Sequence, residues 1–65
     1  MLKVIEVLAS SKKGWEDAAQ NAVSQASNSV KKIRSINVQN MSASVKGGKV
    51  QEYRINAKIT FELNE

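Results

Sequence analysis

The stretch "EYRINAKITFEL", residues 52–63, alternates apolar and polar side chains without a break. The apolar positions are Tyr53, Ile55, Ala57, Ile59, Phe61 and Leu63. The polar or charged positions are Glu52, Arg54, Asn56, Lys58, Thr60 and Glu62. Successive side chains of a strand point to opposite faces of the sheet. The pattern therefore predicts one long strand with an apolar face and a polar face.

The first half of the chain predicts a strand followed by a helix. "LKVIEVLAS", residues 2–10, is rich in β-branched and aliphatic side chains and predicts a first strand. Apolar residues at three- and four-residue spacing then predict one amphipathic helix over about residues 12–33. These apolar positions are Trp15, Ala18, Ala19, Ala22, Val23, Ala26, Val30 and Ile33. Because alanine dominates this stripe, the helix can lie close to the surface on which it packs.

Polar residues near both ends of the predicted helix suit its direction. Ser10 and Ser11 are candidate N-cap residues, since a serine hydroxyl can accept a hydrogen bond from a free backbone N–H group. Acidic residues near the N-terminus and basic residues near the C-terminus complement the helix dipole. These residues are Glu16 and Asp17 at one end and Lys31 and Lys32 at the other.

The second half of the chain predicts a hairpin. A strand is expected over residues 34–46, and its apolar positions change phase part-way. They are Ile36 and Val38, followed by Met41, Ala43 and Val45. A phase change of this kind indicates a bulge or sharp bend near residues 39–40. "KGGK", residues 46–49, predicts a tight turn, because glycine readily adopts positive φ, and a third strand over 49–63 follows.

The order strand, helix, strand, strand predicts an α+β fold with a three-stranded antiparallel sheet and one amphipathic helix. The clean alternation of residues 52–63 places that strand in the centre of the sheet. One narrow helix cannot cover three long strands, so strand ends and edges stay bare. A chain this short is also marginally stable alone. We therefore expect copies of the chain to assemble, and we do not expect the monomer to be the stable unit.

The composition excludes several classes of protein. The 65 residues form one domain, residues 1–65, and cysteine, histidine and proline are absent. Disulfides, zinc sites and histidine catalysis are therefore excluded, and no serine lies beside a plausible base, so we expect no enzyme. The net charge of +4 is dispersed and aromatic residues are few, which disfavours nucleic acid. Candidate membrane spans and signal peptides are absent, so we expect a cytoplasmic protein without membrane partners.

The whole chain resembles the dodecins, small flavin-binding proteins in which a three-stranded antiparallel sheet wraps around a single helix. The resemblance is carried by "KVIEVLASSKKGWEDAAQNAV", "SVKKIRSINV" and "GGKVQEYRINAKITFEL". In that family twelve copies close into a hollow shell. The resemblance therefore implies a homododecamer with a non-catalytic binding or storage function. It also implies FMN, riboflavin or FAD as the cofactor.

The sequence departs from the flavin-binding dodecins at two positions. Those proteins carry a stacking tryptophan early in the second strand, where this chain has Ser35. They carry a glutamine after the tyrosine of the third strand, where this chain has Arg54. The resemblance thus implies a cofactor site formed by Ser35, Arg54, Asn37 and Val38 that binds flavin weakly or in an altered way. Its apolar frame is expected from Ile33, Ile36, Val38, Tyr53 and Ile55.

The resemblance also leaves open a flavin-free shell with a structural or ion-binding role. Some dodecin-like proteins without the tryptophan are associated with calcium. Calcium sites need several converging carboxylate or carbonyl oxygens. The available carboxylates include Glu6, Glu16, Asp17, Glu52 and Glu62. No loop has the spacing of calcium ligands, so we assign no metal ligand.

Two further groups of residues allow two interpretations each. Trp15 lies on the apolar stripe of the predicted helix, which favours a core or subunit contact over ligand stacking. Arg54 and Lys58, four residues apart in the chain and separated by one other residue on the polar face, could bind an anion such as phosphate. They could instead pair with carboxylates of neighbouring strands or subunits. The candidate carboxylates are Glu6, Glu52 and Glu62.

Overall fold

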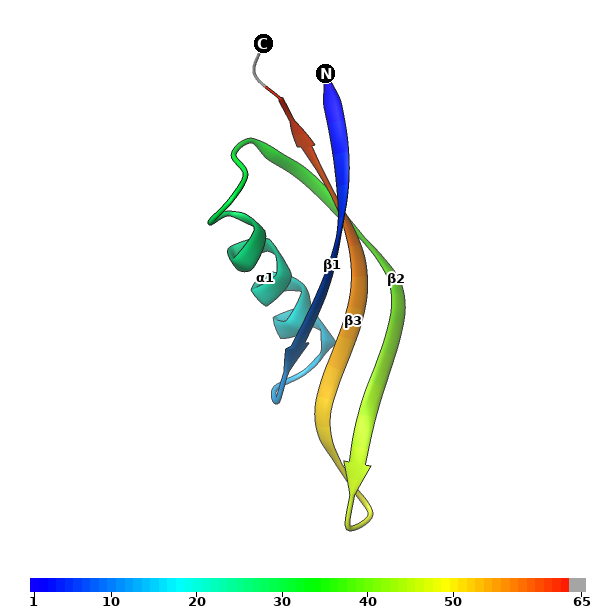
Figure 1. Ribbon diagram of the computed structural model, residues 1–65. Coiled ribbons are helices and arrows are strands. Elements are labelled where there is room, and N and C mark those ends of the chain that lie inside the picture. Colours follow the sequence, from blue (N-terminus) through cyan, green and yellow to red (C-terminus); the bar gives the residue numbers. More distant parts are fainter. Residues whose placement is uncertain (64–65) are drawn as a thin grey trace.

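Three antiparallel strands and one helix make up the computed structural model, which describes residues 1–63. The elements are β1 (Leu2–Ser11), α1 (Trp15–Ala26), β2 (Ile33–Lys46) and β3 (Lys49–Glu62). The sheet order is β1-β3-β2, and α1 lies across one face of the sheet (Figure 1). The predicted α+β fold with a central third strand is therefore confirmed. Each strand begins and ends within about one residue of the expected position.

The hydrophobic core lies between α1 and the centre of the sheet. Ala18 and Ala22 of the helix are fully buried against the apolar face of β3, where Ala57 and Ile59 are also fully buried. Small side chains on both surfaces let the helix approach the strands closely. Half-buried side chains of β1 and β2 flank this core, among them Ile5, Val7, Ala9, Ile36 and Val38.

The phase change in β2 is a bulge, as predicted. Val38 pairs with Ala57, but the next pair joins Asn40 to Asn56, so β2 carries one extra residue at Gln39. An extra residue reverses the faces of all later side chains relative to the earlier pattern. The bulge therefore directs Asn40 to the side of the sheet away from the helix.

The β2–β3 connection is the expected glycine turn. Gly47 has φ of 60° and Gly48 has φ of 76°. Two consecutive residues with positive φ are typical of the tight turn whose twist matches a two-stranded ribbon. The hairpin extends well beyond the helix (Figure 1).

The helix is shorter than predicted. It ends at Ala26 after 12 residues, whereas the expected range reached residue 33. Turns follow, in which the N–H of Ser29 donates to the carbonyl of Ala26 at 3.0 Å, and Lys32 has φ of 58°. Serine and asparagine compete with helical backbone bonding, which explains why "SNS" at 27–29 stops the helix. Val30 and Ile33 still pack against the core, but Val30 does so from the turn after the helix and Ile33 from the start of β2. The expectation that Lys31 and Lys32 lie near the helix C-terminus is wrong for the same reason.

The predicted serine N-cap is also wrong. Gly14 is the N-cap residue, and no side chain caps the helix there. Ser11 instead closes the loop between β1 and α1, because its hydroxyl accepts from the Lys13 N–H at 2.9 Å and donates to Asp17 at 2.6 Å. Glu16 and Asp17 lie in the first helical turn, as predicted.

Large apolar side chains remain uncovered on the single chain. The molecule is elongated, with extents of 51 × 19 × 13 Å. Within residues 1–63, the large apolar side chains that are more than half exposed are Met1, Leu2, Val4, Leu8, Met41 and Val45. This confirms that one helix cannot cover the sheet of an isolated chain.

Candidate functional site

The side of the sheet opposite the helix carries most of the polar side chains, and we call it the open face. Strand register places its residues in cross-strand rows. Near the hairpin, Arg54 lies between Ser10 and Ser42, and Asn56 lies between Leu8 and Asn40. Farther along, the rows are Glu6–Lys58–Asn37 and Val4–Thr60–Ser35.

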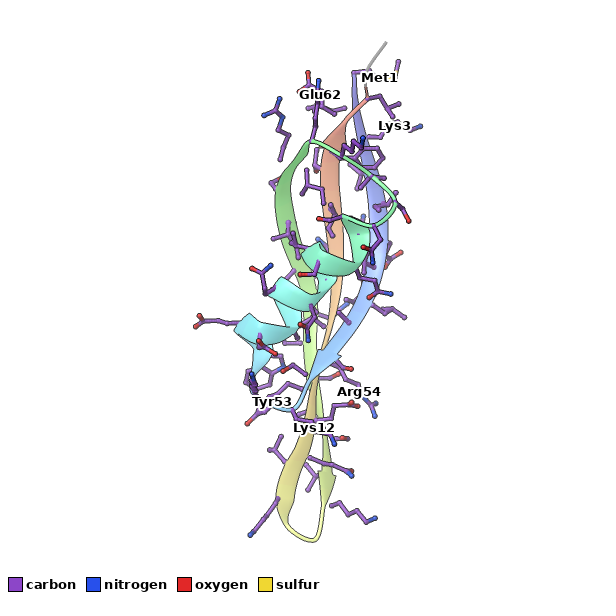
Figure 2. The ribbon with its side chains drawn as sticks, turned by 90° about the vertical axis from the view of Figure 1, so that its left-hand side faces the viewer. Met1, Lys3, Lys12, Tyr53, Arg54 and Glu62 are labelled. Carbon is purple, nitrogen blue, oxygen red and sulfur yellow. The ribbon has the colours of Figure 1, made fainter. Side chains whose placement is uncertain are left out.

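A hollow of about 350 Å³ lies at the hairpin end of the open face. Its lining comes from all three strands and comprises Leu8, Ala9, Ser10, Asn40, Ser42, Glu52, Arg54, Ile55 and Asn56. Figure 2 shows Arg54 and Tyr53 near the hairpin, whereas Met1, Lys3 and Glu62 lie at the other end of the sheet. The hollow combines one cation with hydroxyl and amide groups, which suits a polar ligand.

The guanidinium of Arg54 has a weak partner. Its Nε lies 3.4 Å from Oε1 of Glu52, and the two side chains are 57% and 35% exposed. An exposed ion pair of this kind contributes about 0–1 kcal/mol. Arg54 can therefore exchange Glu52 for another anion at little cost.

Asn56 holds an unsatisfied polar atom beside Arg54. Its side-chain oxygen is buried and has no hydrogen-bond partner among the described residues. A buried acceptor without a donor costs free energy, about 1–3 kcal/mol. The amide therefore gains a hydrogen bond from any ligand donor that it can turn to meet.

The four residues expected to bind a cofactor do not form one cluster within a chain. Ser35 lies opposite Thr60, six residues along β3 from Arg54, which corresponds to about 20 Å of strand. Asn37 lies on the same face between these two rows. Val38 lies on the other face, half-buried against the core. The expected apolar frame lies on that helix side too, because Ile36 packs against the same core.

Trp15 contacts the β2–β3 hairpin. Its indole N–H donates to the backbone carbonyl of Ser42 at 3.0 Å. Its ring meets Tyr53 edge-on, with centroids 4.8 Å apart and an angle of 77°. Its side chain is 40% exposed and lies outside the buried core. These contacts join the start of α1 to the β2–β3 hairpin just behind the hollow.

The carboxylates are spread over the molecule. Glu52 pairs with Arg54, Glu62 pairs with Arg34, and Asp17 accepts from Ser11. Within residues 1–63, no three acidic side chains come together in a group that could hold a metal ion. Of the two alternatives for Arg54, the carboxylate pairing is present on one chain through Glu52, but its geometry is weak.

A model of the family described as dodecin matches residues 1–64. The chain belongs to the dodecin family. In residues 1–63, no helix has the length and apolar character needed to cross a membrane. Dodecins are small binding proteins, and their copies form homo-oligomers.

Solved dodecins have the same fold. The dodecin of Streptomyces coelicolor is 29% identical, with a TM-score of 0.93 over 100% of this chain and 93% of that one. A mutant of the Thermus thermophilus dodecin is 25% identical, with a TM-score of 0.94 over 100% and 97%. A calcium dodecin of Mycobacterium tuberculosis, described as a calcium-chelating antigen, is 35% identical, with a TM-score of 0.83 over 98% and 91%. No curated protein sequence matches the chain.

Most residues that line the hollow of this dodecin were missed from the sequence. Ser10, Ser42, Asn40 and Asn56 come together only through the pairing of three strands. The signal that could have found them is the bulge, since counting pairs across Gln39 places Asn40 beside Asn56. Arg54 and Ile55 were predicted as site residues, and Glu52 was predicted as a possible partner of Arg54.

Proposed function

We propose that this dodecin is a non-catalytic binding and storage protein, a hollow homododecamer that holds flavin or a related nucleotide cofactor. The observation that carries the proposal is the polar hollow on the open face. It contains Arg54, the position at which the family resemblance implies a flavin-contacting glutamine. Ser35 and Asn37 belong to the same face. The proposal places this storage role in the cytoplasm.

The separation of the site residues favours a site shared between copies. About 20 Å of strand separates Ser35 from Arg54 on one chain, farther than one ring system reaches. A flavin that contacts both residues therefore lies between the open faces of two copies. The exposed side chains of Leu2, Val4 and Leu8 on this face gain burial from the same arrangement.

We expect the flavin affinity to be low. Aromatic stacking contributes about 1–3 kcal/mol per ring, and Ser35 offers no ring. Arginine donates hydrogen bonds but accepts none, so Arg54 cannot satisfy the donor groups of an isoalloxazine edge. The cofactor would thus be held mainly by its polar parts.

The test is a titration of riboflavin, FMN and FAD with the assembled protein, followed by quenching of flavin fluorescence. Saturable quenching supports the proposal, and we expect micromolar or weaker dissociation constants. The visible absorption of protein purified without added flavin gives a second readout. Colourless protein that quenches none of the three flavins would contradict flavin storage.

The second candidate is a flavin-free shell that binds calcium or has a structural role. It is favoured by the 35% identity to a dodecin described as calcium-chelating. Because no acidic group of three forms within residues 1–63 of one chain, such a site needs carboxylates from several copies. Calorimetric titration with calcium after removal of bound ions by a chelator separates the two candidates. Heat with calcium and no flavin quenching would favour this second function.

A further inference from the structure

We propose that the hollow around Arg54 binds the phosphate group of a small sugar or polyol phosphate. The inference rests on the proposed function in one respect, since it names the part of a nucleotide cofactor that the hollow holds. The hollow is lined by residues of a single chain, however, and the proposed contacts involve only the phosphate and its hydroxylated carbon chain. The inference can therefore be tested with ligands that have no flavin ring. Three features of the hollow carry it, namely free donors, a displaceable ion pair and an unsatisfied amide.

The hollow gathers donors around one cation. Arg54 lies between Ser10 and Ser42 in the strand register, and all three residues line the hollow. Asn21 and Trp15 donate to the backbone carbonyls of these two serines, and within residues 1–63 neither serine hydroxyl makes a hydrogen bond, so both hydroxyls are available to a ligand. A guanidinium flanked by two hydroxyls presents the donors that phosphate oxygens accept, and an arginine can contact a phosphate through two parallel hydrogen bonds.

The guanidinium is available because its present partner holds it weakly. Glu52 contacts only Nε, at 3.4 Å, and the Arg54 side chain stays 57% exposed. Within residues 1–63, the two terminal guanidinium nitrogens of Arg54 take part in no ion pair. Glu52 is the one carboxylate that lines the hollow, and it can turn toward solvent when a phosphate takes its place.

The amides of the hollow select what is attached to the phosphate. Asn56 and Asn40 form the row next to Arg54, and the buried oxygen of Asn56 lacks a donor. A dianionic phosphate supplies acceptors only, whereas the hydroxyls of a sugar or polyol supply the missing donor. Leu8 completes this row and gives an apolar edge to the hollow. In a phosphate joined to a hydroxylated carbon chain, the phosphate accepts hydrogen bonds from the Arg54 row, and the hydroxyl groups donate to the neighbouring Asn56 row.

The charge of the surrounding chain favours an anion. Ser10 and Ser11 lead directly into Lys12 and Lys13, so two further cations follow the strand end that borders the hollow. The whole chain carries a net charge of +4. Such a field raises the local concentration of anions.

The experiment compares phosphorylated ligands with their neutral counterparts. Ribose 5-phosphate is compared with ribose, and FMN with riboflavin, by calorimetry on the assembled protein. We expect the phosphorylated member to bind at least about tenfold more tightly in each pair, since hydrogen bonds to charged groups contribute more than neutral ones. Inorganic phosphate alone should compete with ribose 5-phosphate.

Matched variants assign the preference to the hollow. Arg54→Gln should remove the tenfold gap, Arg54→Lys should keep part of it, and Lys58→Gln should leave it unchanged. Lys58 is the control because it lies on the same face of β3, four residues from Arg54 along the strand, but does not line the hollow. Equal binding of ribose and its phosphate, or equal loss in Arg54→Gln and Lys58→Gln, would overturn the inference. If the protein bound no flavin but still bound ribose 5-phosphate more tightly than ribose, only the proposed flavin function would be overturned.

Discussion

Compared with the tryptophan and glutamine of flavin-binding dodecins, Ser35 and Arg54 change the chemistry of the open face in two different ways. Ser35 removes an aromatic surface and leaves a small hydroxyl in a row with Thr60. Arg54 adds a cation whose only described ion pair is weak. The first change reduces affinity for any planar ring, and the second raises affinity for an anion. In the proposed cofactor site, the two changes together would shift recognition of a cofactor from its ring toward its phosphate.

Restoring the two family residues tests this at the residue scale. The double variant Ser35→Trp with Arg54→Gln should bind riboflavin at least about tenfold more tightly than the unchanged chain, because stacking alone contributes about a decade or more. Riboflavin is the appropriate probe, since it carries no phosphate for Arg54 to hold. Fluorescence quenching on titration gives the dissociation constants. A double variant that assembles but quenches no better would show that these positions do not form a flavin site.

At the scale of elements, the strands could be predicted from the sequence and the helix end could not. The alternation in β3 fixes face and burial, because each step along a strand reverses the face. Val30 and Ile33 continued the helical spacing, yet Val30 packs from the turn that follows the helix and Ile33 from the start of β2, after Lys32 with φ of 58°. Their periodicity was coincidental. The hollow also escaped prediction, since it depends on pairing between strands distant in sequence.

The β2–β3 turn gives a prediction that isolates backbone conformation. A Cβ atom at Gly48 would meet no atom within 4 Å, but φ there is +76°. Gly48→Ala should therefore lower the free energy of unfolding by about 1–2 kcal/mol through backbone strain alone. Gly48→Asn should cost less, because asparagine tolerates this conformation. Thermal denaturation monitored by circular dichroism measures both changes.

Gly14 supplies the matched control for this turn prediction. A Cβ atom at Gly14 also meets nothing within 4 Å, and the backbone there is extended, with φ of 161°. Gly14→Ala should thus be neutral or slightly stabilising, since alanine restricts the unfolded chain. Equal losses of stability in Gly14→Ala and Gly48→Ala would contradict the assignment of the cost to positive φ.

At the scale of the whole molecule, a single chain leaves large apolar side chains and two strand edges exposed to solvent. The hairpin extends beyond the helix (Figure 1), and its side chains Met41 and Val45 are 64% and 66% exposed. Both outer strands also present unpaired edges, because β3 occupies the centre. Assembly covers such surfaces, and the proposed dodecamer predicts a solution mass of about twelve times the 7.1 kDa chain. A monomeric mass at micromolar concentration would contradict the shell.

The exposed hairpin residues allow assembly to be separated from folding of the chain. In an isolated chain, Met41→Ser with Val45→Ser changes two solvated side chains, so stability should stay within about 1 kcal/mol. If neighbouring copies bury these side chains, each copy loses about 2–5 kcal/mol per large apolar side chain removed. We therefore expect the double variant to dissociate on dilution and to show a concentration-dependent melting temperature. Light scattering across a dilution series measures the mass, and Lys46→Ser, an exposed polar change on the same hairpin, is the control. A double variant that keeps the full mass at every dilution would show that the hairpin stays solvated in the assembly.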